Sequence, residues 1–308
     1  MIGGTVLDPI LKLDNVKKVI KGKEIIKGLS FSVNEGEVFG FLGPNGAGKT
    51  TTIRMIVGLI GITEGDVVVC GKSIRKDFAG AVSHIGAIVE NPEMYKFLTG
   101  YQNLMQYARM QKDISKKKID EVVGLVGLQD RIHDKVRTYS LGMRQRLGLA
   151  QCLLHDPKLL ILDEPTNGLD PAGIREIRDH LKMLTREKGM SVIVSSHLLS
   201  EMEMMCDRIA IIQDGRLAEV QQVNDFVQTG SVYAFETGDL SQALSLLEDK
   251  FGIVRTADGF TAGCTRDEVP VIVESLVERG IAVYGVRAAS QTLEDRFLEV
   301  TGGGVKHG

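Results

Sequence analysis

The chain has 308 residues, enough for two domains, and its 43% hydrophobic and 25% charged residues are typical of a folded protein. With 37 basic and 40 acidic residues the net charge is −3, so we expect no nucleic-acid partner. The four cysteines contain no CxxC pair, which argues against a disulfide framework or a zinc site, and no signal peptide or membrane span is predicted.

Short apolar runs alternate with helical patterns through the first part of the chain. Strand-like runs rich in β-branched residues occur at 37–43, 66–70, 158–164, 190–196 and 208–215. Helical patterns occur at 104–111 and 174–184, and residues 95–155 are mostly helical in pattern. This alternation predicts an α/β core with a largely parallel sheet and a helical insertion.

The pattern changes after about residue 225. Strands are predicted at 231–237, 251–259, 260–265 and 281–289, and helices at 240–250, 267–280 and 292–300. We therefore expect a larger domain over residues 10–225, with a helical subdomain at about 92–155, and a small α+β domain over 226–308. The small domain permits a ferredoxin-like half-fold that could dimerise or bind a small molecule, or it is a lid that stabilises the larger domain.

Residues 43–50 read GPNGAGKT, which fits the phosphate-loop pattern GxxxxGK[ST] between a predicted strand and a predicted helix. Its glycines let backbone N–H groups surround a phosphate, and the helix N-terminus adds a favourable dipole. Lys49 would bridge the β- and γ-phosphates, and the Thr50 hydroxyl would bind Mg²⁺. The alternative is a glycine-rich turn without a ligand. The predicted ATP-binding residues here are Gly43, Pro44, Asn45, Gly46, Ala47, Gly48, Lys49, Thr50 and Thr51.

A second motif, KLLILDEP at 158–165, ends a buried strand in two carboxylates. At the carboxyl edge of the sheet, Asp163 could hold Mg²⁺ through water, and Glu164 could polarise a water for attack on the γ-phosphate. Taken alone, the motif could also be a strand followed by an acidic turn, with Pro165 stopping the strand.

Together with four further segments, these motifs resemble those of the ATP-binding cassette (ABC) ATPases over about residues 10–220. IGAIVENPEMY at 85–95 resembles the segment that usually carries a glutamine, here replaced by Glu90. YSLGMRQR at 139–146 resembles the signature, and NGLD resembles the loop that crosses the dimer interface, with Asp170 at its key position. VSSHLLSEME at 194–203 resembles the switch segment, with His197. The resemblance implies a P-loop nucleotide-binding domain with a mixed sheet and a helical subdomain.

The resemblance also implies roles for these residues. Glu164, supported by the γ-phosphate sensor His197 and by Lys49, would catalyse ATP hydrolysis. Glu90 would join Thr50 and Asp163 as an oxygen ligand of Mg²⁺ or its water. In a head-to-tail dimer, Ser140, Gly142 and Asp170 would contact the ATP held by the other copy.

Three positions depart from the family pattern. The stretch NVKKVIKGKE at 15–24 offers Val19 and Ile20 where many relatives stack an aromatic ring on adenine. Glu90 adds a negative charge. The signature keeps only Ser140 and Gly142 of its usual five residues. Because a hydroxyl and backbone amides at a helix start are what contact the phosphate, we expect the signature to function; the alternative is an ordinary serine-capped helix.

A single cassette without a membrane span implies a separate integral membrane permease, with a second copy or a paralogous cassette completing the dimer at the cytoplasmic face of the membrane. The segment at 91–104 lies where the family receives a helix from the permease. Residues 86–95, the signature and the tail at 292–303 resemble exporters of the bacitracin and lantibiotic-immunity type.

The alternatives are a soluble ABC ATPase with a regulatory or translational role and a chromosome or repair ATPase. The latter needs a coiled-coil insertion, for which the interval between Lys49 and Ser140 has no room. A GTPase is disfavoured because the sequence has no NKxD motif.

Overall fold

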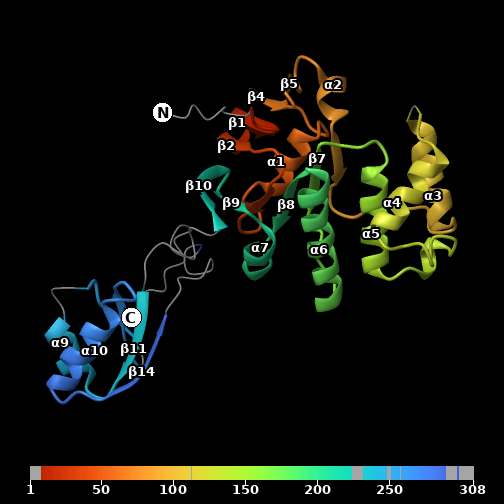
Figure 1. Cartoon of the computed structure of the whole chain (residues 1–308). Helices are drawn as coiled ribbons and strands as arrows, with labels where there is room; N and C mark the ends of the chain where they lie inside the picture. The colour runs from red at the N-terminus through yellow and green to blue at the C-terminus, as the bar shows by residue number, and fades with distance from the viewer. Residues whose placement is uncertain are drawn as a thin grey trace, which may run out of the picture. The chain divides into compact units, whose positions relative to one another are not determined.

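The computed structural model describes residues 8–111, 113–223, 232–247, 251–256, 258–288 and 297. It divides into two compact units, Met1–Gln221 and Gln222–Gly308, each treated separately below (Figure 1). The helix predicted at 292–300 lies outside the described residues except for Phe297. In the described part of the chain, no helix combines the length and the apolar composition that a bilayer crossing requires.

The first unit is built on a six-stranded sheet in the order β10-β9-β3-β8-β7-β6. The pairings from β9 through β6 are all parallel, which confirms the α/β prediction. Its three central strands are buried along their whole length, as expected for a parallel sheet covered on both faces. The strands are β3 (Val38–Leu42), β6 (Ile85–Ile88), β7 (Leu159–Asp163), β8 (Ser191–Ser196), β9 (Arg208–Gln213) and β10 (Arg216–Gln222).

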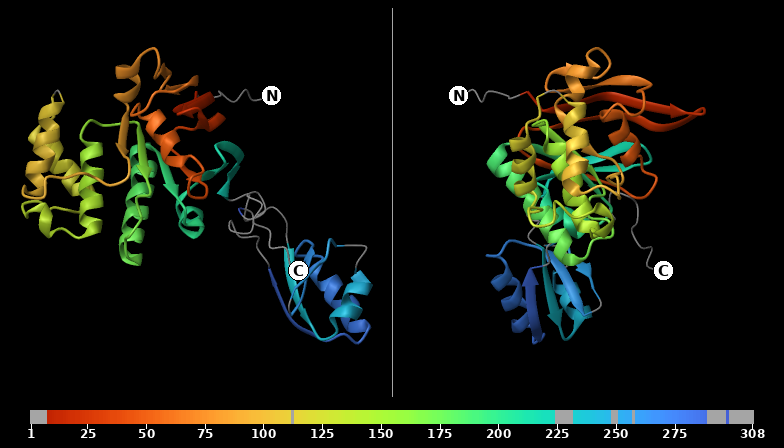
Figure 2. Two further views of the ribbon diagram at one scale, coloured as in Figure 1. Left: turned by 180° about the vertical axis from the view of Figure 1, so that it is seen from behind. Right: turned by 90° about the vertical axis from the view of Figure 1, so that its right-hand side faces the viewer.

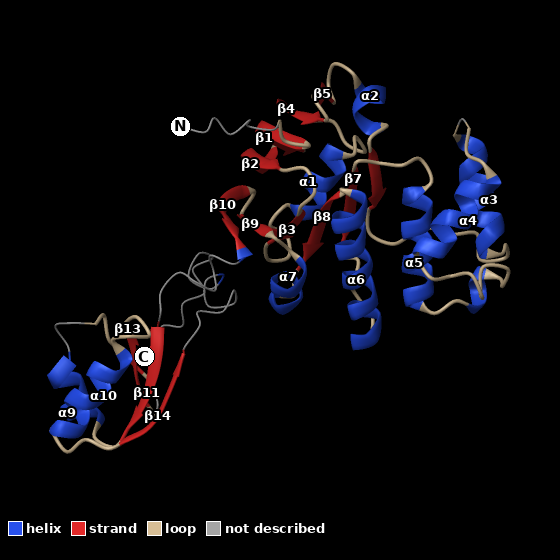
Figure 3. Cartoon of the chain, viewed as in Figure 1, coloured by secondary structure: helices blue, strands red, loops and turns tan. Residues whose placement is uncertain are grey.

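Three helices of the segment predicted as a helical subdomain gather at one end of the unit, beside the sheet (Figure 3). They are α3 (Gly100–Met110), α4 (Lys116–Leu125) and α5 (Leu141–Leu153), and a short 3₁₀ helix, Val136–Thr138, precedes α5. Thr99 begins α3 with a capping box, and Ser115 caps α4 through the Lys118 N–H. The remaining helices are α1 (Lys49–Ile56), α2 (Phe78–Val82), α6 (Pro171–Lys188) and α7 (Leu199–Met205).

A second, antiparallel sheet was largely missed by the sequence analysis, which placed only one strand there, at 66–70. Its order is β2-β1-β4-β5, comprising β1 (Leu11–Ile20), β2 (Lys23–Val33), β4 (Glu64–Val69) and β5 (Lys72–Ser73). Apolar residues of this sheet and of α1 form one hydrophobic core with the central sheet. Figure 2 shows this sheet next to α1, so it supports the helix that follows the phosphate loop.

The second unit is a complete βαββαβ arrangement, whereas the sequence analysis considered a ferredoxin-like half-fold. Its strands pair antiparallel in the order β12-β13-β11-β14, the arrangement of a ferredoxin-like split βαβ fold. The stacked rings of Phe235 and Phe260, 5.0 Å apart, lie in its core. The elements are β11 (Val232–Thr237), α9 (Leu240–Leu247), β12 (Val254–Arg255), β13 (Gly259–Gly263), α10 (Val269–Glu278) and β14 (Val283–Ala288).

A close backbone approach in this second unit yields a stability prediction. A Cβ atom on Gly259 would lie 1.8 Å from the carbonyl oxygen of Phe235 on the paired strand. We therefore expect Gly259→Ala to destabilise the second unit by about 2–4 kcal/mol, since the strands must separate. Hydrogen exchange should accelerate at the amides of β11 and β13 and stay unchanged in the central sheet of the first unit.

Gly263→Ala, on the same strand, is the matched control, because its Cβ would have an ordinary contact at 3.4 Å. Equal protection of the β11 amides in the two variants would contradict the prediction.

Candidate functional site

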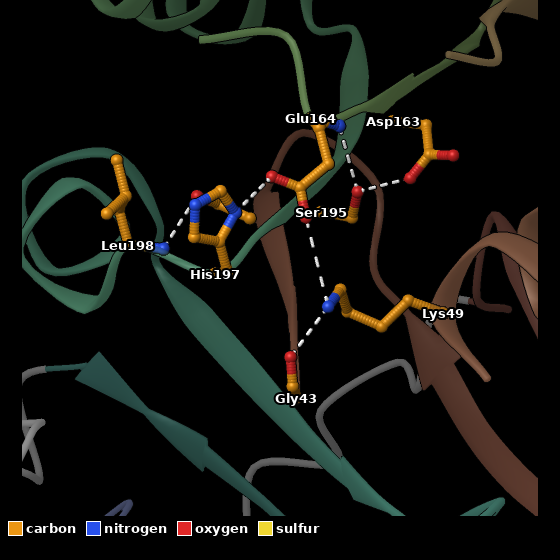
Figure 4. Close-up of polar contacts among 8 residues, drawn as sticks. Gly43, Lys49, Asp163, Glu164, Ser195, His197 and Leu198 are labelled. Carbon is orange, nitrogen blue, oxygen red and sulfur yellow. Dashed lines mark hydrogen bonds and ion pairs between the residues drawn. The ribbon is translucent and has the colours of Figure 1, made fainter. Parts of the chain in front are cut away.

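The site lies at the carboxyl edge of the central sheet. Parallel pairing aligns Leu42 with Ser196 and Asp163 with Ser195, so β3, β7 and β8 end at the same edge. The phosphate loop follows β3, Glu164 follows β7, and His197 follows β8. Figure 4 shows the resulting cluster, in which side chains from three distant parts of the sequence meet.

The predicted phosphate loop lines a cavity of about 380 Å³. Gly46 and Gly48 adopt positive φ angles of 80° and 109°, which L-residues rarely adopt, and Gly48 leads directly into α1. A Cβ on Gly43 would lie 2.4 Å from the Ile212 carbonyl oxygen, so glycine is required there too. The cavity is lined by Ile25, Pro44, Asn45, Gly46, Gly48, Lys49, Thr50, Thr51, Glu164, Asn167 and His197.

Two residues of the predicted phosphate loop, Gly43 and Ala47, do not line this cavity. The Gly43 carbonyl instead accepts a hydrogen bond from Lys49, and the Ala47 side chain is buried. Among the lining residues, Ile25 on β2 is apolar and was missed by the sequence analysis, whereas Val19 and Ile20 are not lining residues. Residues 23–27 read KEIIK, and one of two adjacent isoleucines between charged residues gives no signal of a nucleotide contact.

Lys49 is buried, with 7% of its side chain exposed, and its charge is only partly compensated. Its Nζ donates a hydrogen bond of 2.6 Å to the Gly43 carbonyl and lies 3.8 Å from Glu164 Oε1. Burial lowers the pKa of Lys49, and the carboxylates of Glu164 and Asp163 oppose that shift. A phosphate placed in the cavity would add negative charge beside this ammonium group.

The two carboxylates have different environments. Asp163 is 2% exposed, and its Oδ1 accepts a hydrogen bond of 2.6 Å from Ser195 Oγ. Glu164 borders the cavity, and its Oε2 lies 2.7 Å from His197 Nδ1. The predicted trio of Lys49, Glu164 and His197 is therefore in direct contact.

Of the residues predicted to bind Mg²⁺, Thr50 lines the phosphate cavity, whereas Asp163 and Glu90 are not among its lining residues. Mg²⁺ prefers oxygen ligands and usually combines one or two carboxylates with phosphates and waters. Thr50 borders the cavity, and Ser195 donates a hydrogen bond to one oxygen of Asp163. Within the described residues, no group of three or more His, Cys, Asp or Glu side chains could hold a metal alone. The donor set thus suits a magnesium–nucleotide complex.

Glu90 is engaged by another partner. Its carboxylate forms an ion pair with Arg54 of α1, and its backbone has a positive φ of 67°. Both side chains are substantially exposed, at 61% and 41%. The role of Glu90 as a magnesium ligand stays a prediction, and it would require the carboxylate to leave Arg54.

The signature residues are not among those that line this chain's own phosphate cavity. Ser140 is the N-cap of α5, and its hydroxyl accepts a hydrogen bond of 3.2 Å from the Met143 N–H. Asp170 caps α6 in the same way, through the Gly173 N–H at 2.9 Å. A Cβ on Gly142 would lie 3.8 Å from Leu169, so the start of α5 is adjacent to the loop that precedes α6. None of Ser140, Gly142 and Asp170 is among the residues that line the cavity.

Comparison with known proteins agrees with this geometry. The family described as ABC transporter matches residues 26–167. The chain is 63% identical to the uncharacterized ABC transporter ATP-binding protein YhcH of Bacillus subtilis (strain 168), over 95% of the chain and 96% of that relative. It is 38% identical to the bacitracin transport ATP-binding protein BcrA of Bacillus licheniformis, over 97% of the chain and 99% of that relative. The predicted resemblance to the bacitracin type is confirmed.

A solved structure supports the fold of the first unit. CbiO1 from Clostridium perfringens, described as part of the ABC transporter complex cbiONQ, is 27% identical and aligns with a TM-score of 0.66. The alignment covers 71% of this chain and 90% of that one. The predicted fold class is thereby confirmed.

The ion pair of Glu90 yields a test of its predicted metal role. If Glu90 must leave Arg54 to approach Mg²⁺, then Arg54→Gln should lower the Mg²⁺ concentration that half-saturates Mg²⁺-dependent ATP binding. Exposed ion pairs contribute about 0–1 kcal/mol, so the shift should be at most about five-fold. Titration of a fluorescent ATP analogue with Mg²⁺ measures it.

The control is the same substitution made in a Glu90→Gln background, where no carboxylate remains to be released. Arg54→Gln should then change nothing. A shift of equal size in both backgrounds would show that Arg54 acts independently of Glu90.

Proposed function

We propose that this chain, which belongs to the ABC transporter family of ATP-binding proteins, powers an exporter as its ATP-hydrolysing subunit. Its ATP-binding and ATPase functions follow from membership of the family. The direction of transport, the cargo, the magnesium and the partners are the proposed parts. A regulatory role without transport is not favoured, because Glu164 and His197 are present and in contact.

The main support for this proposal is that the signature residues Ser140 and Gly142 do not line the phosphate cavity of their own chain. Ser140 is exposed at the start of α5, yet the cavity with Lys49 is lined by other residues. A second copy or a paralogous cassette placed head to tail would bring its own Ser140 to this chain's phosphate site. ATP would then act as a ligand that stabilises the dimer, because both copies contact it.

Hydrolysis in such a dimer would use the residues already in contact. Glu164 would accept a proton from the attacking water, while His197 orients its carboxylate and Lys49 holds the γ-phosphate. Magnesium, held through Thr50 and Asp163, would neutralise charge on the phosphate oxygens. Loss of the γ-phosphate would remove the shared ligand and let the dimer open.

A groove in the first unit supports a permease partner. A cavity of about 340 Å³ lies between the end of α1, the segment after β6, and helices α3 and α5. Its lining includes Val57, Ile88, Pro92 and Tyr107, and its rim carries Leu59, whose side chain is 64% exposed. We propose that this groove receives a helix of an integral membrane permease, which would place the chain at the cytoplasmic face of the membrane. The permease would select the cargo, proposed to be an antibiotic or another peptide or lipid-like compound.

Replacement of the proposed base tests both hydrolysis and the dimer. Glu164→Gln should reduce Mg²⁺-dependent ATPase activity by at least about 100-fold, because the amide cannot accept the proton. ATP should still bind, and ATP-bound dimers should accumulate in size-exclusion chromatography with light scattering. A strictly monomeric Glu164→Gln protein at saturating ATP would argue against the head-to-tail arrangement.

The signature needs a separate test. Ser140→Arg places a large cation where the proposed second copy meets ATP, so turnover should be lost while ATP binding to the monomer remains. Lys117→Arg, an exposed change on α4 in the same subdomain, is the control and should leave turnover unchanged. Full ATPase activity of Ser140→Arg would show that the signature is not used.

A further inference from the structure

Ser195 is a buried serine between the Asp163 carboxylate and the Glu164 backbone amide, and no motif identified in the sequence assigns it a role. It is the fifth residue of β8, has no exposed surface, and lies opposite Asp163 in the parallel pairing with β7. Its hydroxyl lies 2.6 Å from Asp163 Oδ1 and 2.9 Å from the backbone nitrogen of Glu164. Figure 4 shows it in contact with both residues.

The directions of these two hydrogen bonds are determined by chemistry. A hydroxyl has one proton, and an ionised carboxylate can only accept, so Ser195 donates to Asp163. The Glu164 N–H can only donate, so the Ser195 oxygen accepts from it. One hydroxyl therefore donates to a buried carboxylate oxygen and accepts from the Glu164 amide, which also lies 3.2 Å from the backbone carbonyl oxygen of Ser195.

Both bonds bear on the proposed chemistry. With Oδ1 of Asp163 held toward Ser195, the orientation of this carboxylate is restrained and its other oxygen is left for the metal or its water. Glu164 has a positive φ of 51°, a conformation that is unfavourable for a residue with a side chain. The hydrogen bond to its amide helps to hold that backbone, and with it the base, in place.

We propose that Ser195 is a positioning residue that fixes Asp163 and Glu164 relative to each other, and thereby sets both the affinity for Mg²⁺ and the rate of hydrolysis. This inference rests on the proposed metal role of Asp163. Ser195 touches neither substrate nor water in the proposed reaction and acts through the two carboxylates.

The neighbouring Ser196 provides a matched control. It is equally buried, with 1% exposed, and sits on the same strand. Its hydroxyl, however, accepts a hydrogen bond of 3.0 Å from the Leu198 N–H, beyond His197, whereas the hydroxyl bonded to Asp163 and to the Glu164 amide is that of Ser195. Removing each hydroxyl separately therefore distinguishes a specific role of Ser195 from a general cost of losing a buried serine in β8.

The test measures binding of a fluorescent ATP analogue to the full chain, with EDTA and across a Mg²⁺ titration, together with ATPase activity. Ser195→Ala should raise the half-saturating Mg²⁺ concentration and lower kcat, each by about ten-fold or more, as expected for losing a hydrogen bond to a charged group. Binding in EDTA should change less than about two-fold, since the phosphate loop is untouched. Ser196→Ala should keep the Mg²⁺ dependence of the wild type.

Two further variants keep the test decisive. Ser195→Thr retains the hydroxyl and should restore the Mg²⁺ dependence. Ser195→Cys retains a similar volume with a weak donor and should behave like Ser195→Ala even if the threonine methyl group is not tolerated.

The proposal is overturned if Ser195→Ala matches Ser196→Ala in its Mg²⁺ titration, or if Ser195→Cys matches the wild type. It is also overturned if Ser195→Ala weakens binding of the ATP analogue in EDTA as much as it weakens binding with Mg²⁺, because that result indicates a general structural defect. A wild-type protein whose ATP binding ignores Mg²⁺ would instead refute the metal assignment itself, and this inference with it.

Discussion

The parallel register of β3, β7 and β8 is the constraint on which the whole site depends. Each strand is a short, fully buried run, and together they bring Leu42, Asp163 and Ser196 to one edge of the sheet. A shift of one residue in β8 that placed Val194 opposite Asp163 would leave Asp163 Oδ1 without its donor. Because these strands are apolar and buried, their register is strongly specified, and this register also positions the polar residues at their ends.

The polar network at this edge is suited to an exchange of partners. Lys49 is held by the Gly43 carbonyl and by Glu164, at 2.6 and 3.8 Å, while burial lowers its pKa. A phosphate oxygen beside Lys49 would be a closer counter-charge than Glu164. The Glu164 carboxylate would then be left to His197 and to water, which is the arrangement that a general base requires. The same contacts can thus hold the site together before nucleotide binds and prepare it for chemistry.

The phosphate loop and the end of β7 could be predicted because their chemistry needs particular residues at fixed spacings within one segment. The role of Ser195 could not be predicted, because it depends on the Asp163 carboxylate, which the strand register places opposite this serine. Arg54 and Ile25 likewise depend on contacts between distant segments. The antiparallel sheet of the first unit was largely missed because lysines interrupt the pattern of β1. In the second unit the strands were predicted, but their closed order β12-β13-β11-β14 depends on pairings between distant segments.

The unusual signature is explained by packing between two neighbouring loops. A Cβ on Gly168 would lie 3.1 Å from Leu141 Cδ2, and one on Gly142 would lie 3.8 Å from Leu169. Leu141 therefore fills space against the loop that leads to Asp170, a place where a glycine would leave a gap. Met143 contributes its backbone N–H to the Ser140 cap, a contact that any residue except proline could make. The changed side chains thus alter how the signature packs on its own chain, while the hydroxyl and amides that would face a second copy's ATP are retained.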